Sequence, residues 1–303
     1  MLLKLDQLRY FVAVADAGQV TRAAASLHIA QPALSQSIAH LEAELDLRLF
    51  ERHPRGVRLT AAGETFYQKT LVALAATDDV ALTAEALKRA AAGTIAFGFL
   101  GTPPQLHCPE LIDALAAAHP EIELDYRELR FPVGETSSWL ADVDAAYCHL
   151  PPPEPDIWAH EVRREPRVVL APATRPCARR GLDLTEILED TFIGLHPDVS
   201  SWWRGFWSLD DLRGGPPLHE TDDRAGDAQE LFAAIASRRA VTAVPARQAD
   251  LAAKIVGNMV TMALDASEPA VLGIVGRKDN FNPLVLRLIA VAEGIGVDGS
   301  ASA

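Results

Sequence analysis

Short polar side chains gather at the start of an amphipathic segment near the N-terminus. They are Gln31, Ser35 and Gln36, with Pro32 beside them. Amide and hydroxyl groups can hydrogen-bond to base edges in a DNA groove, and a glutamine can pair with adenine through two bonds. The chemistry that this cluster offers is therefore the recognition of a base sequence.

Two short helices around a tight turn are expected to hold these groups, over residues 20–45. Thr21 is a good N-cap for the first helix, and Pro32 is tolerated in the first turn of the second. The second helix repeats apolar side chains at helical spacing, which must face a core: Leu34, Ile38, Leu41 and Leu45. Its opposite face is then free for a major groove, as in a helix-turn-helix. An ordinary helical hairpin has the same spacing, so the spacing alone leaves both interpretations open.

A basic hairpin is predicted directly after the helices, over residues 47–60. Pro54 and Gly56 indicate its turn, and it carries four arginines: Arg48, Arg52, Arg55 and Arg58. Arginines in such a wing hold phosphates and set the register of the protein on DNA. Arg52 and Arg55 are the expected phosphate contacts, and the wing favours DNA binding over a plain hairpin.

Two stretches carry a family resemblance: LDQLRYFVAVADAG, and then AAASLHIAQPALSQSIAHLEAELDLRLFERHPRGVRLTAAG. They resemble the N-terminal domain of the LysR-type transcriptional regulators, closely over about the first 65 residues and loosely beyond. The resemblance implies a regulator that binds a dyad operator in double-stranded DNA, responds to a small-molecule effector and contacts RNA polymerase. The DNA-binding candidates are Thr21, Gln31, Pro32, Ser35, Gln36, Arg52 and Arg55. Family members usually have an arginine where this chain has Gln36, so the family's base preference at that position is not carried over.

Length and charge indicate a globular protein of roughly two domains, since 303 residues are ample for real cores. The net charge of −13 is uneven: residues 1–60 hold seven Lys/Arg against six Asp/Glu, a net +1 that leaves −14 for the rest. No apolar run approaches the ~20 residues that span a bilayer, and no basic-then-apolar leader is apparent. A cytoplasmic protein without membrane contact is expected.

The three cysteines offer neither a metal site nor a disulfide framework. Cys108, Cys148 and Cys177 lack CxxC spacing and a nearby histidine cluster, so no metal and no cofactor are expected. One subgroup of the LysR family senses peroxide through a cysteine pair in the second effector subdomain. This chain has only Cys177 there, so thiols without a redox function are expected. No GxSxG, HExxH or Walker-type segment indicates an enzyme. A free-standing binding module would have no use for residues 1–60.

A single long helix is expected over residues 60–92, rich in alanine and free of proline. Thr60 can cap it, and Gly93 ends it. Alternating four- and three-residue spacing is typical of a coiled-coil seam: Phe66, Thr70, Ala73, Thr77, Val80, Ala84 and Leu87. The seam is weakly apolar, so the helix could also be a solvated spacer. The resemblance implies instead a linker helix that pairs two chains antiparallel in a homodimer, with two dimers in a homotetramer.

Short apolar strands alternate with helices beyond residue 93, which predicts an α/β architecture. Strands are expected at residues 94–100, 122–129, 142–150, 167–172, 191–195, 241–245 and 271–277, and helices at about 106–118 and 283–295. The resemblance implies two subdomains like those of periplasmic binding proteins, with an effector between them. The predicted organisation is a winged helix-turn-helix at 3–60 (its helix-turn-helix at about 20–39), a linker helix at 61–92 and an effector-binding domain at 93–297. Subdomain I takes about 93–166 and 267–297, and subdomain II takes about 167–266.

Ligands in such folds lie at the carboxyl ends of strands and at helix N-termini. The effector candidates are accordingly residues that follow predicted strands: Gly101, Thr102, Arg130, Phe131, His196, Ser200 and Trp202. A guanidinium binds a carboxylate through two hydrogen bonds, so Arg130 predicts a small carboxylate effector, aromatic ones included. Alternatively, Arg130 pairs with a nearby acid such as Glu128 or Glu135, and the cleft takes a neutral, apolar molecule.

Overall fold

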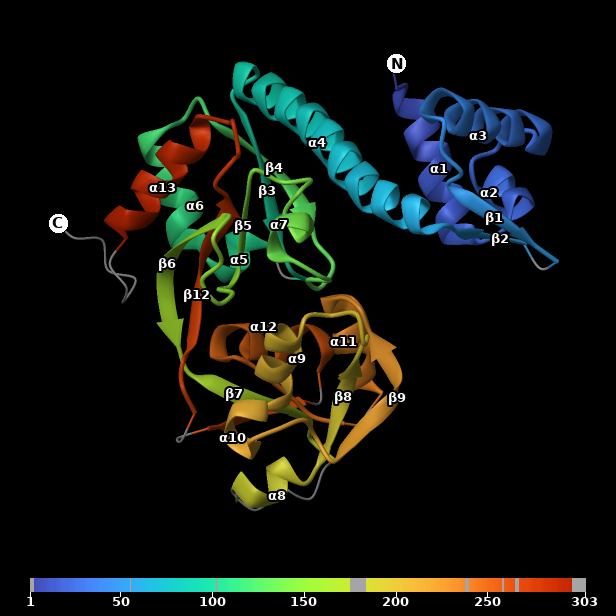
Figure 1. Ribbon diagram of the computed structural model, residues 1–303. Helices are drawn as coiled ribbons and strands as arrows, with labels where there is room; N and C mark the ends of the chain where they lie inside the picture. Colours follow the sequence, from blue (N-terminus) through green and yellow to red (C-terminus); the bar gives the residue numbers. More distant parts are fainter. Residues whose placement is uncertain are drawn as a thin grey trace. The chain divides into compact units, whose positions relative to one another are not determined.

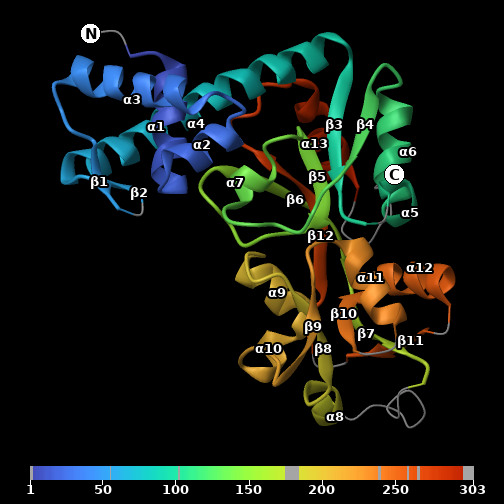
Figure 2. The same ribbon diagram turned by 90° about the vertical axis from the view of Figure 1, so that its right-hand side faces the viewer.

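The computed structural model describes residues 3–54, 56–101, 103–174, 184–237, 240–257, 259–264 and 267–295, apart from the side chains of residues 255 and 256. Contacts divide the chain into two compact units, Met1–Ala84 and Glu85–Ala303, which are described separately (Figure 1, Figure 2). Within the described residues, no helix combines the length and the apolar character that a bilayer span requires. Arg55, Thr102 and Cys177, which the sequence singles out, lie outside the described residues.

The first unit is a group of helices with a two-stranded wing (Figure 1). Its elements are α1 (Leu5–Ala17), α2 (Val20–Ser26), α3 (Gln31–Leu45), β1 (Phe50–His53), β2 (Gly56–Leu59) and the first part of α4 (Ala61–Ala91). Phe11 is fully buried at the centre, with its ring centroid 5.2 Å from that of Phe50 and 5.1 Å from that of Phe66. The apolar face predicted for α3 packs into this core, since Leu34 and Leu41 are fully buried. The predicted helix-turn-helix and wing are confirmed.

The N-cap predicted at Thr21 is wrong. α1 ends at Gly18 in the left-handed conformation (φ 63°), and the chain turns directly into α2, which begins at Val20 with Gln19 at the N-cap position. Thr21 is therefore an exposed residue inside the first turn. Pro32 does occupy the first turn of α3, as predicted, where its missing N–H costs no intrahelical hydrogen bond.

The wing is held against the end of α1 by a close backbone contact. The Val57 N–H donates to the Gly18 carbonyl over 2.8 Å, and a Cβ at Gly56 would lie 2.1 Å from that carbonyl oxygen. Gly56 also has a φ of +144°, a conformation that side chains disfavour. Glycine is required at this position for both reasons.

α4 is the long helix predicted over residues 60–92. Thr60 caps it, because its hydroxyl accepts a hydrogen bond from the Gly63 N–H over 2.9 Å. The predicted seam divides into two parts. Phe66 and Thr70 pack within the first unit, whereas Val80 and Leu87 are 69% and 52% exposed. The later seam positions are therefore the ones open to a second helix.

The second unit is an α/β domain whose strands form two groups (Figure 2). Subdomain I contains a five-stranded sheet of order β4–β3–β5–β12–β6, with β3 parallel to β4 and β5, and β12 antiparallel to its neighbours. Its strands are β3 (Thr94–Phe99), β4 (Glu123–Glu128), β5 (Ala145–His149), β6 (Ile157–Glu165) and β12 (Ala270–Arg277). Its helices are α5 (Pro104–His107), α6 (Pro109–Ala118), α7 (Thr136–Trp139) and α13 (Leu284–Gly294). α6 and α13 cover one face of the sheet, where Ile95, Phe97 and Ile274 are fully buried.

Subdomain II contains the sheet β10–β7–β11 and the parallel pair β8–β9. Its strands are β7 (Arg167–Pro172), β8 (Thr191–Leu195), β9 (His219–Ala225), β10 (Thr242–Pro245) and β11 (Met259–Ala263). Its helices are α8 (Leu184–Leu188), α9 (Ser201–Ser208), α10 (Asp210–Arg213), α11 (Ala228–Ala236) and α12 (Ala246–Val256). The chain passes between the subdomains after β6 and again before β12. The predicted α/β fold of two subdomains, with the last strand and helix returning to the first sheet, is confirmed.

One predicted helix is broken. α5 and α6 stand where a single helix was expected at about 106–118, because Cys108 precedes Pro109 and leaves the helical conformation (φ −140°, ψ 59°). The ring of a proline clashes with a helical residue before it. α5 therefore ends at His107, whose side chain is buried.

The fully buried carboxylate of Asp144, just before β5, joins three segments of the second unit. Arg89, in the last turn of α4, donates to it from Nε and Nη2 over 2.8 and 2.7 Å. The Ala96 N–H of β3 and Asn282 Nδ2 each donate to it over 2.9 Å. Burial alone would raise the pKa of Asp144, but the hydrogen bonds from Arg89, Ala96 and Asn282 outweigh burial and hold the pKa below its ordinary value.

Replacing Asp144 with asparagine should destabilise the second unit by about 3–5 kcal/mol, because Arg89 loses the counter-ion of a largely buried charge. In the wild type, the carboxylate contributes its full stabilisation above its unfolded-state pKa. This contribution is lost as the pH falls through the lower folded-state pKa, and the variant should lack that acid-dependent loss. Urea unfolding followed by circular dichroism, at neutral pH and across about pH 2–5, measures both effects.

Glu161→Gln is the matched control, since it breaks an exposed ion pair with Arg164 in the same subdomain and should cost less than about 1 kcal/mol. An Asp144→Asn protein that unfolds like the wild type at neutral pH would contradict the structural role of the carboxylate.

Candidate nucleic-acid interface and effector cleft

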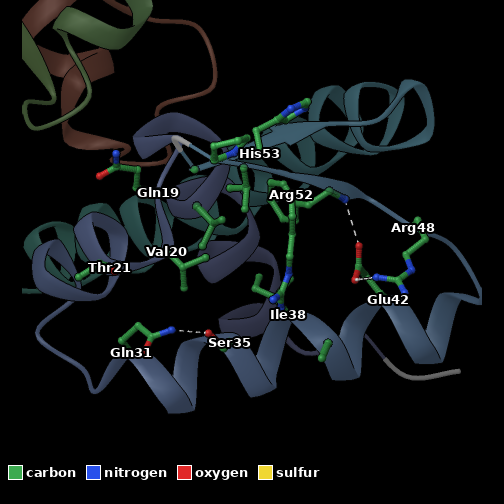
Figure 3. A pocket seen from close by; sticks show the side chains of 16 residues that line it. Gln19, Val20, Thr21, Gln31, Ser35, Ile38, Glu42, Arg48, Arg52 and His53 are labelled. Carbon is green, nitrogen blue, oxygen red and sulfur yellow. Dashed lines mark hydrogen bonds and ion pairs between the residues drawn. The ribbon is translucent and has the colours of Figure 1, made fainter.

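A groove of about 470 Å³ lies between α3 and the wing in the first unit (Figure 3). Its walls include four of the predicted DNA-binding residues: Thr21, Gln31, Ser35 and Arg52. They also include Gln19, Ala39, Glu42, Arg48 and His53. The groove thus brings the start of α3 and the basic strand β1 onto one surface, as joint contact with bases and phosphates requires.

The polar residues at the start of α3 are accessible. Gln31 Nε2 donates to Ser35 Oγ over 2.9 Å (Figure 3), so one of the two N–H donors of this amide is occupied, while its second N–H can donate and its carbonyl oxygen can accept. Pro32 and Gln36 are exposed too, but they do not line the groove. The predicted recognition residues therefore fall into two sets, one in the groove and one on the adjoining surface of α3.

Arg52 is placed to meet a phosphate. Its side chain is exposed and extends from β1 toward α3 (Figure 3), and it makes no hydrogen bond or ion pair with the described residues. Arg48 Nη1, by contrast, lies 3.9 Å from Glu42 Oε2, and His53 Nε2 lies 3.8 Å from Glu51 Oε2. Among the described arginines of the groove, Arg52 is therefore the one without an acidic partner.

Glu42, which the sequence pattern does not single out, ties the wing to α3. Its Oε1 accepts hydrogen bonds from the backbone N–H groups of Leu49 and Phe50, over 2.7 and 3.0 Å. On the other side of the wing, Thr60 Oγ1 donates to the Arg48 carbonyl over 2.7 Å. The sequence does contain a signal for this role. Glu42 adjoins the apolar face of α3, where a carboxylate needs hydrogen-bond partners, so a structural role could have been predicted for it.

The segment after β4 joins the two subdomains of the second unit. The Phe131 N–H donates to the Gly226 carbonyl over 2.9 Å, and the Ser200 N–H donates to the Pro132 carbonyl over 2.8 Å. Phe131 is 1% exposed, with its ring centroid 5.7 Å from that of Trp203. Two predicted effector residues, Phe131 and Ser200, are thus brought to the interface between the subdomains, the first as a packed aromatic ring.

Arg130 pairs with acids of the opposite subdomain. Its Nη2 lies 3.6 Å from Asp227 Oδ2 and 3.6 Å from Glu230 Oε2, at the start of α11. An acidic partner was one of the two alternatives for Arg130, but Glu128 and Glu135 are the wrong acids, because the fold brings a distant segment closer. The Arg130 side chain is 69% exposed, so these are surface ion pairs of modest strength.

Two further effector candidates, Gly101 and His196, stay predictions, and the structure shows their contacts. Gly101 has a φ of +68°, and a Cβ there would lie 2.3 Å from the Cβ of Ala228, so glycine allows α11 to approach β3 closely. His196 is exposed, and its Nδ1 lies 3.4 Å from Asp198 Oδ2 and accepts a hydrogen bond from the Asp198 N–H over 3.4 Å.

An aromatic cluster on α9 faces the end of β5. Trp203 and Phe206 are buried, as their helical spacing predicts, and Trp202 is half-buried with its ring centroid 5.1 Å from that of Trp203. His149, which the sequence does not single out, stacks on Phe206 with 3.8 Å between ring centroids. Burial, aided by the charge of Arg167, lowers the pKa of His149 to about 4. This imidazole is therefore neutral at neutral pH.

The described cysteines, Cys108 and Cys148, are free and buried. Burial raises the pKa of both thiols, which opposes formation of the reactive thiolate. Their environment is that of packing residues rather than of a redox sensor.

Two family models match the chain. The model described as "Bacterial regulatory helix-turn-helix protein, lysR family" matches residues 5–64, and "LysR substrate binding domain" matches residues 88–293.

Sequence relatives include the HTH-type transcriptional regulator BenM of Acinetobacter baylyi, 32% identical over 201 residues that cover 64% of each chain. The uncharacterized HTH-type transcriptional regulator YnfL of Escherichia coli is 29% identical over 252 residues, covering 81% of this chain and 83% of that one. The crystal structure of full-length BenM has a TM-score of 0.51 at 26% identity, with 99% of this chain and 100% of that chain covered. Full-length CbnR complexed with the target DNA has a TM-score of 0.50 at 23% identity, covering 96% and 99%, a likeness of fold alone.

Replacing Glu42 with alanine should weaken DNA binding by roughly tenfold, because the N–H groups of Leu49 and Phe50 lose their acceptor and the wing loses its orientation. Glu42→Gln keeps an amide oxygen in the same place and should bind within about threefold of the wild type. Fluorescence anisotropy with DNA from upstream of the gene, measured at several salt concentrations, reports the affinity and the number of phosphates that the protein neutralises.

Glu51→Ala provides the charge control, since it removes an exposed acid from the wing without touching these backbone bonds, and its affinity should equal or exceed that of the wild type. If Glu42→Gln binds as weakly as Glu42→Ala, the negative charge beside Arg48 is what matters, and the positioning role is wrong.

Proposed function

Because the chain belongs to the LysR family of bacterial transcriptional regulators, we propose that it binds a dyad site in double-stranded DNA and that a small molecule held between its two subdomains changes this binding. The observation that carries the DNA-binding part is the shared groove of α3 and the wing, lined by Gln31, Ser35 and Arg52. The polar first turn of α3 enters the major groove, and Arg52 holds a phosphate beside it. The other proposed contacts are Thr21, Pro32, Gln36 and Arg55.

Two chains pair along α4 in this proposal. Val72, Val80 and Leu87 are each more than half exposed on this helix, and a helix of a second copy would cover them. Such a dimer presents two recognition helices to half-sites one helical turn apart, about 10–10.5 base pairs. Two dimers form the proposed tetramer, which acts on DNA in the cytoplasm and contacts RNA polymerase there.

Gln36→Ala should cost about 1–3 kcal/mol of binding, concentrated at one base pair per half-site, because the amide contacts a base edge. Arg52→Ala should instead weaken all sequences about equally and lower the salt slope by roughly one for each phosphate that the variant no longer neutralises. Selection from randomised operators, followed by titrations at several salt concentrations, separates the two effects.

An unchanged base preference in Gln36→Ala would refute the base contact. A changed preference with an unchanged salt slope in Arg52→Ala would show that Arg52 contacts bases instead of phosphates. An enzyme or a free-standing binding module would leave the upstream DNA unbound even in the wild type, and that result would overturn the proposal as a whole.

The finer part of the proposal concerns the effector. A small carboxylate on Arg130 stays a prediction, and the charges of Asp227 and Glu230, each 3.6 Å from Arg130 Nη2, oppose the approach of an anion. A neutral molecule meets no such repulsion. The ion pairs of Arg130 therefore favour a neutral effector.

Arg130→Ala should leave the affinity for benzoate, a small aromatic carboxylate, unchanged within about twofold, since exposed ion pairs contribute little. Isothermal titration calorimetry of the full-length protein measures this. Arg127→Ala, which removes an arginine paired with Asp125 on the same strand, is the matched control. A loss of about tenfold or more in Arg130→Ala alone would restore Arg130 as the anchor of a carboxylate effector.

A further inference from the structure

A small cavity lies where the two subdomains meet. Its volume is about 20 Å³, room for a single water molecule. Its lining residues come from both subdomains, among them Leu100, Tyr147 and His149 from the first and Trp203, Trp207 and Gln248 from the second. Because both subdomains form its wall, any movement that parts them widens it.

The wall of this cavity concentrates polar atoms that have no partner. Of ten buried side-chain nitrogen and oxygen atoms without a hydrogen bond in the described residues, four belong to its lining: His107 Nε2, Tyr147 Oη, Trp203 Nε1 and Trp207 Nε1. Their residues are 6%, 3%, 1% and 4% exposed, so bulk water does not reach them. A buried polar atom without a hydrogen-bond partner destabilises a fold, so four in the lining of one cavity indicate a site for a molecule that supplies the missing partners.

The neighbours of these atoms do not satisfy them. His107 Nε2 lies 4.0 Å from Glu165 Oε1, which is beyond hydrogen-bond distance. The Tyr147 hydroxyl interacts with the Cys108 thiol, whose sulfur is only a weak acceptor, so a ligand oxygen would be a better partner. Other tryptophans of the same unit differ in this respect. Trp139 Nε1 donates to a backbone carbonyl over 2.8 Å, and Trp158 Nε1 does so over 3.0 Å.

The cavity carries no net charge at neutral pH. None of its described lining residues is Lys, Arg, Asp or Glu. Burial, together with the charges of Arg247 and Arg163, lowers the pKa of His107 to about 4, and burial has the same effect on the pKa of His149. The two arginines are themselves engaged, at 2.8 Å (Arg163) and 3.2 Å (Arg247) from Glu110. An anion in this part of the wall would find no free cation.

Aromatic faces make up much of the remaining wall. The rings of Trp203 and Trp207 lie 5.5 Å apart with a tilt of 56°, and Phe131 flanks them at 5.7 and 6.0 Å. Opening the subdomains would expose these aromatic faces to water. A flat ring inserted between the subdomains would cover the faces again.

On the basis of the proposed function, we infer that this cavity is the closed state of a binding site for a flat, uncharged molecule whose carbonyl or hydroxyl oxygens accept hydrogen bonds from Tyr147, Trp203 and Trp207. The ligand enters when the subdomains part, and it stabilises the more open arrangement because it makes these bonds only there. His107 and Gln248 are the neutral polar groups that complete the wall.

Benzamide and benzoate test the ligand class, since they share their ring and shape and differ in charge. In calorimetric titrations, the full-length protein should bind benzamide at least about tenfold more tightly than benzoate. Tyr147→Phe and Trp207→Phe each remove one donor and keep an aromatic ring, and each should weaken benzamide binding about fivefold. Trp158→Phe is the matched control, because it removes an N–H that a backbone carbonyl already satisfies, and its benzamide affinity should equal that of the wild type.

Benzoate binding as tight as benzamide binding would overturn the neutral ligand class. Equal benzamide affinity in the wild type, Tyr147→Phe and Trp207→Phe would overturn the site, and Tyr147→Phe decides alone if Trp207→Phe does not fold. Absence of benzamide binding at about 10 mM would overturn both. Binding of upstream DNA by the same preparations is measured in parallel, so that a failure of the ligand site is distinguished from a failure of the proposed regulatory function.

Discussion

The buried carboxylate of Asp144 is the interaction on which subdomain I is assembled. It accepts hydrogen bonds from Arg89 of α4, Ala96 of β3 and Asn282 just before α13, which are distant in the sequence. Because a buried charge that loses its counter-ion is strongly unfavourable, these segments hold together or fail together. The end of α4 therefore moves as one body with subdomain I, whatever subdomain II does.

Subdomain II is attached by contacts of another kind. The polar links include two backbone hydrogen bonds, at Phe131 and Ser200, and the ion pairs of Arg130. They also include the ion pair of Arg247 with Glu110 and the hydrogen bonds from Gln229 to Glu128. Exposed pairs of this kind are each worth on the order of 1 kcal/mol or less. The apolar links, Phe131 and Trp203 among them, resist opening only while water is what replaces them. A ligand that covers the same faces removes most of that cost, so modest binding energy suffices to shift the arrangement. In the proposed function, effector binding would therefore move subdomain II relative to subdomain I and the end of α4 that is attached to it.

Elements whose pattern is local could be predicted from the sequence. The apolar face of α3, the wing with its glycine turn, and α4 with its Thr60 cap all depend on spacing within a few residues, and the structure has them as expected. Wrong predictions of element boundaries arise where the local pattern favours one conformation and a nearby glycine or proline imposes another. Thr21 has the right side chain for an N-cap, but the left-handed turn at Gly18 places the N-cap of α2 two residues earlier, at Gln19. Cys108 likewise lies within an apolar helical pattern that Pro109 interrupts.

The features of the candidate site also divide into those that the sequence predicts and those that depend on the finished fold. Position after a strand is a topological property, so the sequence could place Phe131 and Ser200 near the boundary between the subdomains. Pairing is a property of the finished fold: Arg130 has acids close by in the chain, yet the fold gives it Asp227. The unpartnered donors are harder still to predict from the sequence. Trp158 and Trp207 are the same residue type, but the fold places a carbonyl beside the indole N–H of the first and none beside that of the second. What a cleft can bind depends on the donors, acceptors and charges that remain after every internal pair is made. The described lining of the small cavity holds no charged side chain, and the indole N–H groups of Trp203 and Trp207 there have no acceptor, which is why we infer a neutral ligand.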